Sequence, residues 1–197
     1  MNQFIKELEK ALIDDEVDIA VHSLKDFTSS QAPQLQLSGF LKAESISDAL
    51  ILNQPHTAKT LAELPEGLTI ATGSLRRKAM FKEFRPDFKC VDIRGNIETR
   101  LRKMAEENYD CVMLSYAGLI RMNITPETMI IMPPQEFYPA PGQGVITIQT
   151  RKSDDATHQF IQQINDKTQA QISTLELSRS EEHTSELQSP CNLVCRL

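Results

Sequence analysis

Residues 68–115 read LTIATGSLRRKAMFKEFRPDFKCVDIRGNIETRLRKMAEENYDCVMLS, and this stretch decides the fold class. Its apolar runs at 68–72, 89–93 and 109–115 have the length and composition of buried strands. Between them, 75–84 and 97–107 have the spacing of helices, with Ser74 and Asn96 at the two N-cap positions. Strands that alternate with helices over short connections predict an α/β protein with mostly parallel sheets flanked by helices.

The same patterns extend to both sides of this stretch. Apolar residues on one face predict a helix over 2–14, and Pro139–Gln143 reads as a hinge or loop. The other expected elements are strands at 17–23, 35–41, 47–52, 129–132 and 144–149, short helices at 61–67 and 117–121, and a helix at 157–164.

Composition narrows the class of protein. The chain has 197 residues, of which 40% are hydrophobic, and its net charge is −6. A surface that binds nucleic acid over most of its area is therefore not expected, because such a surface carries net positive charge. Its apolar runs, such as Met129–Pro134, are too short to span a bilayer, and residues 1–9 lack the apolar stretch of a secretion signal. Four cysteines in a chain of this length do not make a disulfide framework. We therefore expect a soluble, cytoplasmic globular protein that binds neither nucleic acid nor membrane.

Positive charge gathers between residues 73 and 121, and much of it is arginine. Arg76 and Arg77 follow the strand at 68–72, Arg94 ends the next strand, and Arg100 lies in the helix after it. Arg121 follows the third strand and its short helix. Any one of these arginines could simply lie on a solvent-exposed helix face. Because they follow three successive strands, however, we expect them to meet at one rim of the sheet. That rim predicts a ligand with several carboxylates or phosphates, and no nucleotide-binding glycine motif is present.

A second cluster of polar residues is VHSLKD at 21–26, again after an expected strand. Lys25 can pair with an anion, and Asp26 can accept a proton or stabilise a developing cation. The alternative is that Lys25 and Asp26 form an exposed ion pair that contributes little to stability. We expect His22 to be a hydrogen-bonded structural histidine rather than a base or a ligand. No metal site is expected, because no histidine lies at ligand spacing and Cys90 and Cys111 fall in buried strands.

Five segments in this order and spacing resemble the porphobilinogen deaminase (hydroxymethylbilane synthase) family. They are VHSLKD at 21–26, ATGSLRRKA at 71–79, IRGNIETRLRKM at 93–104, YDCVMLSYAGLIRM at 109–122 and PAPGQGVITIQTR at 139–151. The resemblance covers residues 1 to 178. It implies a transferase of tetrapyrrole (heme) biosynthesis that joins four porphobilinogen molecules head to tail into hydroxymethylbilane and releases ammonia at each step. It also implies two lobes like those of periplasmic binding proteins, an α+β third domain, and a dipyrromethane cofactor held by a thioether to a third-domain cysteine.

The resemblance assigns roles to individual residues. Asp26 matches the catalytic aspartate, which contacts pyrrole N–H groups and stabilises the positive charge that develops as ammonia leaves. The residues that match cofactor-carboxylate binders are Lys25, Ser74, Arg76 and Arg77. The residues that match substrate-binding positions are Arg94, Arg100, Arg121 and Gln143. Each pyrrole of the growing chain carries an acetate and a propionate, which fits the arginine rim.

The resemblance also divides the chain. It implies a first domain of 1–46 and 142–163, a second domain of 47–141, and the start of the third domain at 164–178. The family's first strand would precede residue 1, and its Gly-Gly-Cys segment has no match here. Residues 179–197 resemble the translation of a sequencing-library adapter, so we expect a non-native tail in which Cys191 and Cys195 have no cofactor role.

The sequence supports three hypotheses of function. We expect the chain to be a monomeric piece of the deaminase that is inactive by itself, because the cofactor thiol has no match. A non-catalytic two-lobed module that binds a small carboxylate is the alternative, since this architecture hosts both functions. A DNA-binding regulator is weaker, because no helix-turn-helix segment precedes the lobes and the net charge is negative.

Overall fold

The computed structural model describes residues 3–27 and 31–187, with side chains for 5–27 and 31–179. The chain divides into two compact units, each with its own core. Unit 1 comprises Met1–Ala43 and Pro141–Leu197, and unit 2 comprises Glu44–Ala140. The sequence expectation set the second domain at 47–141, so the two divisions differ by three residues at one boundary and by one at the other.

Unit 2 is built on a five-stranded sheet in the order β5-β4-β6-β3-β7. The strands are β3 (Asp48–Leu52), β4 (Thr69–Ala71), β5 (Lys89–Val91), β6 (Cys111–Ser115) and β7 (Met129–Ile131). β4 is parallel to β5 and β6, whereas β3 is antiparallel to β6 and β7. Four strands therefore run in one direction and β3 runs against them.

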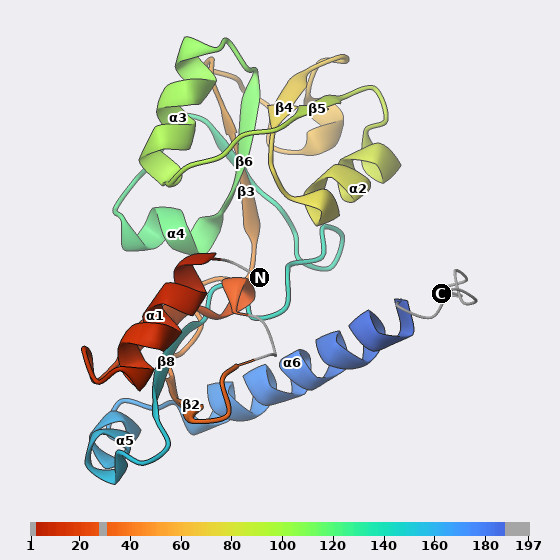
Figure 1. Cartoon of the computed structure of the whole chain (residues 1–197). Coiled ribbons are helices and arrows are strands. Elements are labelled where there is room, and N and C mark those ends of the chain that lie inside the picture. The colour runs from red at the N-terminus through yellow and green to blue at the C-terminus, as the bar shows by residue number, and fades with distance from the viewer. Residues whose placement is uncertain (1–2, 28–30, 188–197) are drawn as a thin grey trace. The chain divides into compact units, whose positions relative to one another are not determined.

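Helices cover both faces of this sheet (Figure 1). The helices of unit 2 are η2 (Leu61–Glu63), α2 (Leu75–Phe84), α3 (Ile97–Glu106) and α4 (Tyr116–Arg121). Phe81 of α2 packs with Leu50, Ile70 and Met113 on one face. Met104 of α3 and Leu119 of α4 pack with Val112 and its neighbours on the other face. Because successive strand residues point to opposite faces, the continuous apolar run of β6 is buried on both sides.

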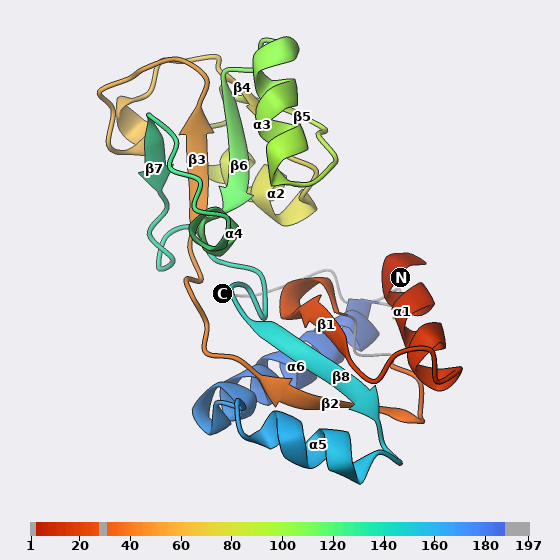
Figure 2. The same ribbon diagram turned by 90° about the vertical axis from the view of Figure 1, so that its left-hand side faces the viewer.

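Unit 1 contains a three-stranded antiparallel sheet in the order β1-β8-β2 (Figure 2). The strands are β1 (Ala20–Ser23), β2 (Leu35–Phe40) and β8 (Ile146–Arg151). The helices of this unit are α1 (Gln3–Ile13), η1 (Leu24–Asp26), α5 (Asp155–Gln162) and α6 (Lys167–Leu187). β8 lies between two strands that precede it by more than a hundred residues, so unit 1 closes only after the chain has returned from unit 2.

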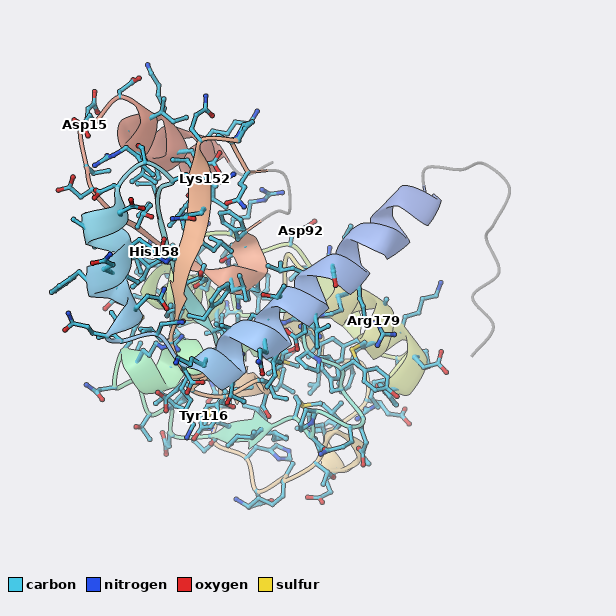
Figure 3. The ribbon with its side chains drawn as sticks, turned by 90° about the horizontal axis from the view of Figure 1, so that it is seen from below. Asp15, Asp92, Tyr116, Lys152, His158 and Arg179 are labelled. Atoms are coloured by element: carbon cyan, nitrogen blue, oxygen red, sulfur yellow. The ribbon has the colours of Figure 1, made fainter. Side chains whose placement is uncertain are left out.

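Three helices pack against the strands of unit 1. Leu12 of α1 packs with Ala20 and Leu35, and α6 contributes to a second cluster around Phe40 and Val145. On α5, His158 lies beside β2, with its Nδ1 3.0 Å from the hydroxyl of Ser38 (Figure 3). These contacts fix the sheet whose edge carries η1.

The α/β class is confirmed, but the expectation of mostly parallel sheets is wrong for unit 1, where every pairing is antiparallel. In unit 2 the expectation is correct for four of the five strands, which run in the same direction. The reason is chain connectivity: a helical crossover returns the chain in the same direction, as from β4 through α2 to β5. No crossover helix precedes β3 or β8, the strands that enter unit 2 and re-enter unit 1, and residue patterns do not encode their directions.

The C-terminal expectations concern residues 164–197. Most of the segment expected to begin a third domain lies in α6, which packs against β2 and is grouped with unit 1. The expected non-native tail at 179–197 overlaps the end of α6, and its residues 188–197 lie outside the described part of the chain. Both assignments stay predictions.

Candidate functional site

The candidate ligand-binding edge of unit 2 is formed by the carboxyl ends of β5, β4 and β6. These strands are parallel neighbours, so their following loops meet at one edge of the sheet. The amide of Thr72 donates to the carbonyl of Val91 at 2.8 Å, which ties the first two loops together. A Cβ on Gly73 would lie 3.0 Å from the carbonyl oxygen of Ile93, so a side chain at this position would crowd the loop after β5.

Two helix N-termini open onto this edge. Ser74 caps α2, with its hydroxyl accepting from the amide of Arg77 at 3.4 Å, and Asn96 caps α3, with its side chain accepting from the amide of Thr99 at 2.8 Å. The first amides of a helix carry partial positive charge and lack partners within the helix. The predicted caps are confirmed, and the two N-termini provide hydrogen-bond donors suited to carboxylate groups.

Arg76 and Arg77 sit in the first turn of α2, where the helix dipole disfavours cations. Arg77 is buried, and its Nη1 donates to the carbonyl of Met113 at 2.8 Å. Arg76 is half-buried, and its Nη1 donates to the carbonyl of Tyr138. Two cations at the positive end of a helix need an anion close by.

Asp48, the first residue of β3, provides that anion. Its carboxylate is fully buried and pairs with Nη2 of Arg77 at 2.6 Å and with Nη2 of Arg76 at 2.7 Å. Because β3 is antiparallel to β6, its first residue pairs with Ser115 at the end of β6, on the edge that carries the arginines. Sequence reasoning missed Asp48, although an acidic residue at the start of an otherwise apolar strand was the available signal.

The other predicted arginines lie at different distances from this edge. Arg94 is exposed in the loop after β5, and Nε of Arg100 donates to the carbonyl of Gly95 at 2.7 Å, which holds its side chain beside the same loop. Arg121 is the last residue of α4, so six helical residues, about 9 Å of helix, separate it from the end of β6. The structure brings Ser74, Arg76, Arg77, Arg94 and Arg100 to the edge and leaves Arg121 at the far end of α4.

The second candidate cluster belongs to unit 1. Lys25 and Asp26 form η1 directly after β1, and Asp26 is exposed. The amide of Leu24 donates to the carbonyl of Val145 at 3.0 Å, so the turn that carries Gln143 lies beside η1. Gln143 is buried, at 1% exposure, and Lys25 is half-buried. The structure therefore brings Lys25, Asp26 and Gln143 to one end of the β1–β8 pair.

His22 belongs to a buried chain of polar groups behind η1. Its Nε2 lies 3.1 Å from Oε1 of Gln149, and Nε2 of Gln149 donates to Oε1 of Glu9 at 3.0 Å. Burial lowers the pKa of His22, and the hydrogen bond with Gln149 and the charge of Glu9 partly oppose that effect. His22 is thus a hydrogen-bonded structural residue that supports η1, as the sequence analysis predicted.

The described cysteines do not fit a reactive or metal-binding role. Burial raises the pKa of Cys111 to about 12 and also raises the pKa of Cys90. Among the described residues, no group of three or more His, Cys, Asp or Glu side chains is placed to hold a metal ion. In the same part of the chain, no helix is long and apolar enough to cross a membrane.

A cavity of about 220 Å³ lies in unit 2 at the opposite edge of the sheet, beyond the amino ends of β4 and β6. His56, Asn108 and Asp110 are among its lining residues. Its polar groups are largely engaged: Asp110 accepts from the amide of Thr69 at 2.7 Å, and Nδ1 of His56 accepts from the amide of Ala58 at 2.9 Å. No arginine lines it, so the cationic edge is the better candidate for an anionic ligand.

Comparison with known proteins places these residues in a family. The sequence profile described as "Porphobilinogen deaminase, dipyromethane cofactor binding domain" matches residues 1–159. Proteins named porphobilinogen deaminase are 40% identical over 168 residues in Chlorobium luteolum and 43% identical over 163 residues in Deinococcus radiodurans. The matches cover 85% and 83% of this chain but 53% and 52% of those proteins, so the chain spans about half the length of the curated relatives it matches.

Solved structures resemble the fold at low sequence identity. A putative methionine-binding lipoprotein from Bacillus subtilis aligns with a TM-score of 0.51 at 16% identity, over 83% of this chain and 76% of that one. An ABC transporter periplasmic substrate-binding protein from Coxiella burnetii aligns with a TM-score of 0.50 at 13% identity, over 86% and 80%. These likenesses confirm an α/β fold of the periplasmic-binding-protein type.

Proposed function

The chain belongs to the porphobilinogen deaminase family, and we propose that it supplies the ligand-binding and catalytic side chains for the condensation of porphobilinogen into hydroxymethylbilane. The observation that carries the proposal is the edge of unit 2, where two helix N-termini and several arginines gather around the loops after β4 and β5. Porphobilinogen carries an acetate and a propionate, and guanidinium groups with helix amides are the donors that bind carboxylates best.

The same edge fits the dipyrromethane cofactor, which carries two such pairs of carboxylates. By the family resemblance, Ser74 with the N-terminus of α2, Arg76 and Arg77 would hold them. Lys25 of unit 1 is also assigned to cofactor carboxylates by that resemblance. Among the described cysteines, neither is suited to the thioether, because burial raises the pKa of both thiols. When bound, the cofactor supplies the pyrrole carbon to which the first substrate is joined.

Asp26 is the proposed catalytic residue. Each condensation breaks a C–N bond, releases ammonia and forms a C–C bond, so positive charge develops on the pyrrole while ammonia leaves. An exposed carboxylate on a turn held by Leu24 and Val145 can accept a hydrogen bond from the pyrrole N–H and stabilise that charge. Arg94, Arg100, Arg121 and Gln143 are proposed to bind the carboxylates of substrate and growing chain. The proposal retains the expectations of a cytoplasmic, monomeric protein.

Calorimetric titration of porphobilinogen into the full chain tests the binding half of this proposal. We expect saturable binding that weakens as salt is raised, because ion pairs with exposed arginines are screened. Arg94→Gln should raise the dissociation constant about tenfold, equivalent to roughly 1.4 kcal/mol, by removing one charged contact. Lys152→Gln is the matched control, since this exposed lysine lies at the end of β8 and donates to the carbonyl of Pro33.

Pyrrole without carboxylates serves as the ligand control and should not bind. Equal binding of pyrrole and porphobilinogen would contradict the carboxylate assignment. Binding of porphobilinogen that Arg94→Gln leaves unchanged would remove Arg94 from the proposed site. Binding of other small dicarboxylates as tightly as porphobilinogen would favour the non-catalytic carboxylate-binding module instead.

A further inference from the structure

The proposed carboxylate site accounts for the charged groups of porphobilinogen and leaves its ring without a partner. Guanidinium groups and helix amides bind any dicarboxylate of suitable length, because they recognise negative charge and hydrogen-bond acceptors. A pyrrole ring is planar and aromatic, and apolar or aromatic side chains are the groups that recognise such a ring. A binding edge that selects porphobilinogen therefore needs a side chain of this kind beside the arginines.

Two residues next to Arg76 carry exposed apolar side chains. Leu75 precedes Arg76 in the first turn of α2 and is 81% exposed. Tyr138 is 65% exposed, and its carbonyl accepts from Nη1 of Arg76. Single exposed apolar residues are common on protein surfaces, so exposure alone does not identify a ligand contact. Tyr138 is distinguished by its hydrogen bond, which holds the backbone that carries the ring beside the guanidinium of Arg76.

The backbone of Tyr138 is restrained on both sides. Phe137 is buried, packs against Phe81 with ring centroids 5.3 Å apart, and donates from its amide to the carbonyl of Pro133 at 2.8 Å. Pro139 follows Tyr138, and a residue before proline is restricted to extended backbone conformations. Because little backbone freedom is left to lose when a ligand stacks on the ring, such a contact can contribute to affinity.

The other aromatic side chains of unit 2 are buried, packed against the core or placed away from this edge. Tyr116, the first residue of α4, packs against the cluster that contains Val112. Tyr109 precedes β6 and so lies toward the opposite edge of the sheet, and Phe84 is the last residue of α2. The buried ones are Phe81, Phe88 and Phe137. Among the described residues of unit 2, Tyr138 is thus the aromatic residue that is both exposed and bound to an arginine of the edge.

We propose that Tyr138 is a specificity-determining residue that stacks on the pyrrole ring of porphobilinogen while Arg76 binds a carboxylate. The inference rests on the proposed function, because it takes porphobilinogen as the ligand. One stacked ring is too weak to hold free pyrrole, which lacks the carboxylates. The arginines therefore provide most of the affinity, and Tyr138 provides the preference for an aromatic ligand over an aliphatic one.

Calorimetric titration of the full chain with two ligands separates recognition of the ring from recognition of the carboxylates. One ligand is porphobilinogen. The other is pimelate, whose two carboxyl groups are joined by the same number of carbon atoms as those of porphobilinogen but which has no ring. Tyr138→Leu removes the aromatic ring and keeps an apolar side chain. It should raise the dissociation constant of porphobilinogen about fivefold, the effect of one aromatic pair, and leave that of pimelate unchanged.

Two further variants serve as controls. Tyr138→Phe keeps the ring without its hydroxyl and should recover the affinity for porphobilinogen that Tyr138→Leu loses. Phe84→Leu makes the same kind of change at an exposed aromatic residue at the far end of α2, and it should bind both ligands like the parent. Because both positions are exposed, we expect all three variants to fold, as judged by circular dichroism.

Tyrosine emission gives a second measurement of the same contact. The chain has three tyrosines and no tryptophan, so its fluorescence comes from tyrosine. Stacking should make porphobilinogen quench this emission in the parent and quench it much less in Tyr138→Phe, although that variant still binds. Equal quenching in the two proteins would contradict stacking on Tyr138.

The possible results distinguish this inference from the proposed function. An affinity for porphobilinogen that Tyr138→Leu leaves unchanged would overturn the stacking role alone. An equal loss of affinity for both ligands would also overturn it, because Tyr138 would then act through Arg76. A loss that Tyr138→Phe does not recover would assign the effect to the hydroxyl instead of the ring. A parent chain that does not bind porphobilinogen would overturn the proposed function and this inference with it.

Discussion

The side chains that surround η1 show how a single buried residue supports a candidate catalytic turn. His22 is 5% exposed, forms a hydrogen bond with Gln149 and packs against the tilted ring of Phe27, with ring centroids 5.3 Å apart. Burial of the imidazole lowers the pKa of His22 below its ordinary value of 6.5. The neutral ring is therefore the form that the folded protein accommodates.

A lowered histidine pKa makes stability depend on pH in a defined direction. Between the folded-state pKa and 6.5 the unfolded chain binds more protons, so the free energy of unfolding falls as pH drops through this window. We expect His22→Gln to be less sensitive than the parent when urea unfolding is measured at pH 7.5, 6.5 and 5.5. The remaining histidines are common to both proteins and cancel in the comparison. A steeper decline in the variant, or parallel curves, would contradict this account of His22.

At the scale of elements, the turn before β8 and the turn after β1 are packed against each other. Gly142 has φ of +68°, its amide donates to Glu176 of α6 at 2.8 Å, and a Cβ there would lie 2.7 Å from Cγ of Leu24. The position thus needs glycine for two separate reasons, backbone conformation and space. The positive φ of Gly142 and the space beside Leu24 both keep η1 close to Gln143.

Substitution at Gly142 can be separated into these two contributions. Gly67 has φ of +77° but nothing within 4 Å of an added Cβ, so Gly67→Ala reports the backbone cost alone, about 1 kcal/mol. Gly142→Ala adds the overlap with Leu24 and should cost about 3 kcal/mol. Urea unfolding followed by the NMR signals of each unit measures both. Equal losses in the two variants would show that Leu24 does not confine the turn.

The sequence predicted most elements because their signals are local. Ser74 and Asn96 identified two helix starts, since a cap lies within three residues of the amide that it binds. The directions of β3 and β8 could not be predicted in this way, because each strand follows a segment in which the chain passes from one unit to the other. Asp48 was missed for a related reason: its partners are 28 and 29 residues away, and only the pairing of β3 with β6 brings them together.

At the scale of the whole molecule, the chain separates its two candidate clusters between its two units. The candidate ligand-binding edge, with Arg76, Arg94 and Arg100, belongs to unit 2, and Lys25, Asp26 and Gln143 belong to unit 1. Each cluster stands at the end of a sheet that is buried by its own helices. We therefore propose that unit 2 provides the arginines that bind carboxylates, and that unit 1 provides the catalytic carboxylate of Asp26 together with Lys25 and Gln143.

Ammonia release from porphobilinogen tests this account most directly. A chimera in which residues 1–159 replace the matching segment of the Clostridioides difficile relative, 40% identical over 170 residues, supplies the remaining length of a porphobilinogen deaminase. We predict that the chimera releases ammonia and that Asp26→Asn lowers the rate at least a hundredfold without loss of folding, as expected when charge stabilisation in the transition state is removed. A folded chimera that releases no ammonia, or an Asp26→Asn variant as fast as its parent, would contradict the account.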